Sequence, residues 1–61
     1  MNDLIAKKDE LNALMDIFNT EITKYVEKGN KSAAVRARKA LLEIGKATKE
    51  VRVLIQESKA E

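Results

Sequence analysis

A single break in a chain without proline is the feature that most constrains how this sequence can fold. The segment Lys28-Gly29-Asn30 carries turn chemistry, because Gly29 can take the left-handed conformation that closes a helix and Asn30 can cap the helix that follows. Gly45, the other glycine, stands alone inside a helical pattern. We therefore expect two helices, over about 3–28 and about 31–58, joined by a corner at 29–30.

Length and composition bound the class of protein. Sixty-one residues suffice for one small domain, which we place over 1–61. The chain contains no His, Cys or Trp, which excludes a disulfide framework, a zinc site built on Cys or His, and catalysis through either residue. No segment approaches the roughly 18 apolar residues that span a bilayer, and Met1–Glu10 is too charged for a signal peptide. We expect a cytoplasmic all-α protein with no cofactor and no membrane partner.

Apolar residues recur with helical spacing in both halves of the chain. In the first half the expected row comprises Leu4, Leu11, Met15, Phe18, Ile22 and Tyr25. In the second half the expected seam comprises Ala34, Ala37, Leu41, Ile44, Thr48, Val51 and Ile55. A second row lies beside it and comprises Ala33, Ala40, Ala47 and Leu54. The pattern predicts an antiparallel, coiled-coil-like helical hairpin.

Several aliphatic residues fall outside these rows. Isolated aliphatic side chains are common on protein surfaces, and that is one interpretation. The other is an interface with a second copy, because a single helix–helix seam does not offset the entropy lost in ordering the chain. On this interpretation we expect a four-helix bundle or a larger oligomer, with a dimer as the default. The interface residues would be Val35, Leu42, Val53, Leu14 and Ile17.

The residue pattern gives little support to an enzymatic role. Glu43, Glu50 and Glu57 recur every seven residues, which is typical of a solvated or ion-paired helix edge. The serine and threonine hydroxyls have no histidine to activate them, and a two-helix hairpin offers no obvious pocket. We expect no enzyme activity, no catalytic residue, no metal site and no small-molecule substrate.

Positive charge is concentrated in the second half. Residues 1–28 carry four basic and six acidic side chains, whereas residues 29–61 carry eight basic and four acidic ones. Lys31, Arg36 and Arg38 lie in the early turns of the second helix, where the helix dipole disfavours cations unless an anion is bound. Two interpretations are open: a solvated face with ion pairs along the helix, or a surface that binds phosphates.

One stretch resembles a known family. Its sequence, Lys28-Gly29-Asn30-Lys31-Ser32-Ala33-Ala34-Val35-Arg36-Ala37-Arg38-Lys39-Ala40, resembles the KGNKxAaxRaRKa segment of the chlamydial linker-histone-like proteins and their short bacterial relatives. The pattern continues at Leu42-Glu43, Lys46, Lys49-Glu50, Arg52 and Glu57-Ser58-Lys59. The resemblance implies a bacterial nucleoid-associated protein that binds DNA phosphates without strong sequence preference. Longer family members carry a Lys- and Ala-rich tail, whereas this sequence ends at Glu61. The cations that match the family by position are Lys28, Lys31, Arg36, Arg38, Lys39 and Arg52.

Two functions therefore compete. The first is a histone-like, homo-oligomeric DNA-binding protein of the nucleoid. The alternative is a structural oligomerisation or interaction module with little or no DNA binding, in which basic rows pair with acidic rows of a neighbouring subunit. A membrane-surface helix is weaker than either, because acids and bases are mixed on both faces and no Trp anchors an interface.

Overall fold

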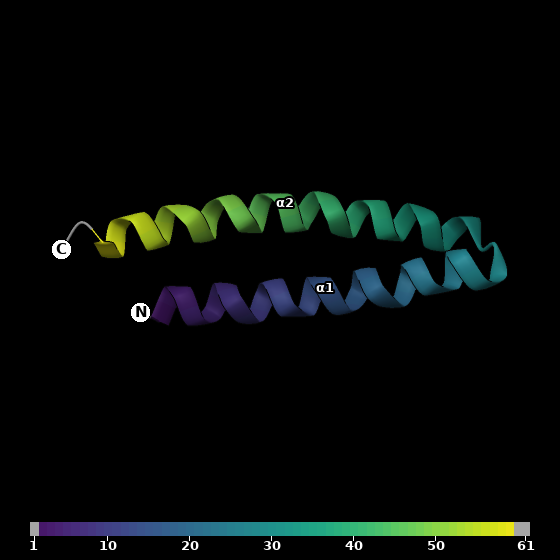
Figure 1. Cartoon of the computed structure of the whole chain (residues 1–61), viewed down its shortest axis with the longest axis horizontal. Helices are drawn as coiled ribbons and strands as arrows, with labels where there is room; N and C mark the ends of the chain where they lie inside the picture. Colours follow the sequence, from purple (N-terminus) through teal and green to yellow (C-terminus); the bar gives the residue numbers. More distant parts are fainter. Residues whose placement is uncertain (1, 60–61) are drawn as a thin grey trace.

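Two long helices lie side by side and run in opposite directions (Figure 1). The computed structural model describes residues 2–59, and the side chains of residues 3–58. Helix α1 spans Asn2–Lys28 and helix α2 spans Lys31–Lys59, so the rod measures 49 × 15 × 11 Å. The predicted helical hairpin is confirmed. Its assembly into a four-helix bundle stays a prediction.

The corner is built by local chemistry at Gly29 and Asn30. Gly29 has a φ of 65°, in the left-handed region, and its N–H donates to the carbonyl oxygen of Tyr25 at 2.9 Å. This conformation ends α1 without the steric penalty that a side chain would add. The Oδ1 atom of Asn30 accepts the N–H of Ala33 at 3.2 Å, which caps α2. Both roles were predicted from the sequence.

The contact between the helices follows a regular 3-4 spacing. On α1 the buried and half-buried positions along this spacing are Leu4, Lys7, Leu11, Leu14, Phe18 and Glu21. On α2 they are Ala33, Ala37, Ala40, Ile44, Ala47, Val51 and Leu54. Four alanines form the buried apolar core, and among the described residues no large side chain is fully buried. The helices therefore meet through small residues that permit a close approach.

The expected seam was wrong at four positions. Met15, Tyr25, Leu41 and Ile55 remain 42%, 45%, 49% and 43% exposed. The α2 row that we expected to lie beside the seam, with its three alanines and Leu54, faces α1 instead. On α1 the inward row passes through Leu14 and includes two charged residues, which a search for apolar periodicity overlooks. Small side chains occupy the central positions because they let the two backbones approach more closely.

Candidate functional site

Exposed cations follow the outer face of α2. Lys31, Arg38 and Arg52 belong to one seven-residue row, and Lys39 and Lys46 belong to a neighbouring row, with Lys49 between the two. All six side chains are exposed, and none of them takes part in an ion pair within residues 3–58. We call this set, Lys31, Arg38, Lys39, Lys46, Lys49 and Arg52, the basic stripe. At 1.5 Å per residue it extends over roughly 32 Å of helix.

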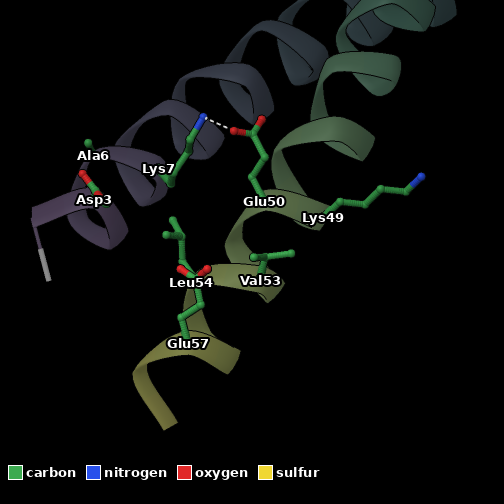
Figure 2. A pocket seen from close by; sticks show the side chains of 8 residues that line it. All are labelled: Asp3, Ala6, Lys7, Lys49, Glu50, Val53, Leu54 and Glu57. Carbon is green, nitrogen blue, oxygen red and sulfur yellow. Dashed lines mark ion pairs between the residues drawn. The ribbon is translucent and has the colours of Figure 1, made fainter. Parts of the chain in front are cut away.

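The carboxylates of α2 lie in a different row from the basic stripe. Glu43, Glu50 and Glu57 share a seven-residue row with Arg36, on the side of α2 where ion pairs reach α1. Glu50 is therefore turned toward Lys7, whereas Lys49 extends away from α1 (Figure 2). The neighbouring stripe thus contains six cations and no acid. This separation of charge concentrates positive potential on one face of α2.

Arg36 is separated from the other predicted cations. Its Nε donates to Glu21 Oε1, and Lys24 Nζ approaches Glu21 Oε2 at 3.4 Å. Glu21 is only 8% exposed, and the Arg36 guanidinium, with a smaller contribution from Lys24, lowers the pKa of its carboxyl. Arg36 therefore acts first as the partner of a buried carboxylate. Sequence reasoning missed this pair because its members lie 15 residues apart and meet only when the helices are in register.

The remaining predicted cations keep exposed positions. Lys28 is in the last turn of α1, where it suits the helix dipole, and Lys31 begins α2 across the corner. Both side chains are exposed. Lys28, Lys31, Arg38, Lys39 and Arg52 thus stay accessible. The Arg36 side chain is also 50% exposed, but it is paired with Glu21.

The aliphatic residues expected to form an oligomer interface occupy three different environments. Val35, Leu42 and Val53 are exposed on the outer face of α2, among the cations of the basic stripe. Leu14 is half-buried and follows the inward spacing of α1. Ile17 is half exposed. The structure does not bring these five residues onto one surface, and their role as an interface stays a prediction.

Ion pairs also join the two helices near the open end of the hairpin, away from the corner. Lys7 Nζ lies 2.7 Å from Glu50 Oε2 and 3.2 Å from Glu10 Oε2. The hydrogen bond to Glu50, followed by the one to Glu10, raises the pKa of Lys7. Beside this cluster lies an open pocket of about 520 Å³, between the start of α1 and the end of α2 (Figure 2). Its lining mixes aliphatic and charged side chains: Leu54 and Val53 with Asp3, Lys49 and Glu57.

The part of the chain that the structure describes offers neither a cluster of metal ligands nor a membrane-spanning helix. Among those residues no three acidic side chains lie close enough together to hold a metal ion. Neither α1 nor α2, over the same residues, is long and apolar enough to cross a membrane.

Comparison with known proteins identifies one family. The family described as histone H1-like protein Hc1 matches residues 5–61, which is nearly the whole chain. No curated protein and no solved structure gives a significant match. The chain belongs to the histone H1-like Hc1 family, as the sequence around the corner suggested.

Proposed function

From its membership of the histone H1-like Hc1 family, we propose that this chain is a nucleoid-associated protein that binds DNA through the basic stripe. The observation that carries the proposal is the set of six exposed cations on the outer face of α2, none of which has an ion-pair partner in the described part of the hairpin. The carboxylates of α2 lie in an adjoining row. Cations arranged in this way attract phosphates and release the counterions condensed on a duplex.

The dimensions of the stripe suit a duplex. Its length of roughly 32 Å is close to one helical turn of B-DNA, about 34–36 Å. A straight α-helix can therefore present cations to phosphates along the rim of one groove. Lys28, at the end of α1, extends the positive surface beyond the start of the stripe at Lys31. The family-matched contacts that we propose are Lys28, Lys31, Arg38, Lys39 and Arg52.

Binding of this kind should be weakly sequence-specific. Base readout requires side chains that reach base edges, or aromatic rings on which bases stack. The chain has one Phe and one Tyr; Phe18 is half-buried on the inward row of α1 and Tyr25 lies on the helix opposite the stripe. Neither aromatic ring belongs to the stripe. Phosphate contacts would thus provide most of the affinity, which makes it strongly dependent on salt.

Two arginines on the same helix provide a matched test. Arg38 belongs to the stripe, whereas Arg36, two residues earlier, is held by Glu21. Arg38→Gln should weaken binding to duplexes of unrelated sequence by a similar factor and lower the slope of log K against log salt by about 1. Arg36→Gln removes the same charge and should change that slope much less. Gel-shift titrations at several salt concentrations would measure both, with circular dichroism to confirm helicity.

The outcomes separate the proposal from its alternative. Equal losses in the two variants would show that the chain responds only to net charge, which would contradict the assignment to the stripe. No retardation of DNA by the wild-type protein in dilute buffer would favour the structural interaction module. A parallel titration with duplex RNA would report whether the phosphate contacts distinguish the two backbones.

A further inference from the structure

We propose that the outer face of α2 also binds the surface of an anionic phospholipid bilayer, with its cations at the headgroup phosphates and its aliphatic side chains inserted between the headgroups. The inference goes beyond the proposed function and does not require that the chain bind DNA. The outer face consists of three adjoining seven-residue rows that point away from α1. Its residues are Lys31, Arg38, Gly45 and Arg52; Ser32, Lys39, Lys46 and Val53; and Val35, Leu42, Lys49 and Gln56.

The outer face combines positive charge with apolar surface and contains no acid. All twelve residues are exposed: six are the cations of the basic stripe, three are aliphatic, and three are small or polar without charge. A membrane contact was not expected from the sequence, because acids and bases are mixed along both helices. The fold separates them, since Glu43, Glu50 and Glu57 lie in the adjoining row, on the side where ion pairs reach α1.

The aliphatic residues of the outer face distinguish a lipid surface from a duplex. Val35, Leu42 and Val53 are 66%, 70% and 55% exposed, and contacts with DNA phosphates make no use of them. Leu42 lies four residues from both Arg38 and Lys46, so cations flank it along the helix. The long stems of these cations allow their charged groups to stay among the headgroups while Leu42 enters more deeply. Such a mixture of basic and aliphatic side chains is typical of helices that lie in a membrane interface.

The rows that border the outer face set how the hairpin would lie on lipid. One border is an uncharged row that includes Leu41 and Ile55, which are 49% and 43% exposed. The other border is the row that contains Glu50. A rotation toward Leu41 and Ile55 adds apolar area to the contact and keeps the carboxylates away from the anionic surface. We therefore expect these two residues to approach the headgroups as well.

The charge on the opposite side of the hairpin supports the same orientation. Over residues 5–27, the three rows of α1 that point away from α2 contain Asp9, Asp16 and Glu27 and no cation. The hairpin therefore presents six cations outward from α2 and three acids outward from α1. An anionic surface attracts the first face and repels the second, so α2 should lie against the bilayer with α1 above it.

Co-sedimentation with vesicles tests the surface. We expect the wild-type chain to bind vesicles of phosphatidylcholine and phosphatidylserine in a two-to-one mixture, and to bind pure phosphatidylcholine far more weakly. Leu42→Gln with Val53→Gln should weaken binding to the anionic vesicles about tenfold, because two aliphatic side chains no longer leave water. The same variant should retard DNA as the wild type does. Ile5→Gln with Val26→Gln, which changes two exposed aliphatic residues on the outward rows of α1, is the matched control and should leave vesicle binding unchanged.

Each outcome decides between this proposal and simpler explanations. Absence of binding to the anionic vesicles, or equal binding to neutral ones, would overturn the proposal. Unchanged vesicle binding by the Leu42→Gln, Val53→Gln variant would reduce the interaction to charge alone and would also overturn it, as would an equal loss in the control. Failure of the proposed function would appear separately, as vesicle binding without retardation of DNA. Circular dichroism would confirm that every variant keeps its helicity.

A fluorescence measurement tests the orientation without removing apolar surface. The chain has no tryptophan, so Leu42→Trp places a single probe on the outer face of α2, and Val26→Trp places one on an outward row of α1. With anionic vesicles whose acyl chains carry bromine, the Leu42→Trp fluorescence should shift to the blue and be quenched, because an interfacial helix buries its apolar side chains at the acyl boundary. The Val26→Trp fluorescence should stay unchanged. Equal quenching of the two probes, or no quenching of Leu42→Trp, would overturn the proposal.

Discussion

Substitution of the two glycines by alanine should shift stability in opposite directions. Gly29 closes α1 with a φ of 65°, whereas Gly45 lies within the continuous helix α2. A Cβ atom built at either position meets no atom within 4 Å. Steric contact is therefore absent at both sites, and backbone conformation alone decides the sign.

The two effects can be sized separately. Within a helix, glycine is less favourable than alanine by about 1 kcal/mol, so Gly45→Ala should raise the free energy of unfolding by that amount. At Gly29 an alanine in the left-handed region costs about 1–2 kcal/mol, and part of this is offset because alanine also restricts the unfolded chain. Gly29→Ala should therefore lower the free energy of unfolding by about 1 kcal/mol. The two variants should differ by about 2 kcal/mol, or about 10 °C in melting temperature for a domain of this size.

Circular dichroism during thermal and urea unfolding would measure both variants. The three proteins must be compared at one chain concentration, because the oligomer expected from the sequence would make the melting temperature depend on concentration. Gly29→Asn is the control, since asparagine tolerates the left-handed region better than alanine does and should lie between Gly29→Ala and the wild type. Shifts of the same sign for Gly29→Ala and Gly45→Ala would refute the reasoning.

Three further substitutions probe the corner, the buried carboxylate and the close helix approach. Asn30→Ala removes the side chain that accepts the N–H of Ala33 and should lower the free energy of unfolding by about 1 kcal/mol, measured in urea. Arg36 lowers the pKa of Glu21 in the folded state. The ionised carboxylate therefore stabilises the fold fully at pH values above 4.5, the ordinary pKa of a glutamate, and this contribution is lost as the pH falls through the lowered folded-state pKa. Glu21→Gln should lack that part of the acid dependence, and a pH series of melting temperatures that matched the wild type would contradict it. Ala37→Leu overpacks the buried core and should cost about 1–3 kcal/mol by the same urea assay, whereas an unchanged midpoint would show that the helices separate freely there.

The parts of the fold that the sequence predicted are those set by local chemistry. Gly29 and Asn30 define the corner by their own backbone and side-chain preferences, and the absence of proline allows both helices to continue. The inward seam depends on more than apolar spacing. Lys7 and Glu21 occupy inward positions on α1, and both are charged. A search for hydrophobic residues therefore shifted the row to Met15.

The candidate site was predictable to a similar degree. The exposed cations of α2 follow from helical spacing, because residues seven apart share a face whatever the partner helix does. The contact that Arg36 makes does not follow from helical spacing. Its contact with Glu21 requires the register in which the corner brings the two helices together, and no periodicity within one helix contains that information. A buried glutamate on the inward row is the signal that could have pointed to a basic partner on the other helix.

Side-chain size is distributed unusually in this hairpin, and the distribution has a consequence for assembly. Alanines occupy the closest approach of the helices, so each buried position removes little apolar area from water. The larger side chains of Leu41 and Ile55 lie beside that contact, half exposed, and gain burial only when another surface covers them. Ion pairs on the opposite side fix the register that brings these side chains onto the same side as Met15. On the proposed function, the rows of α2 thus have different roles: the alanines set the spacing between the helices, and the outer cations remain free to bind phosphate.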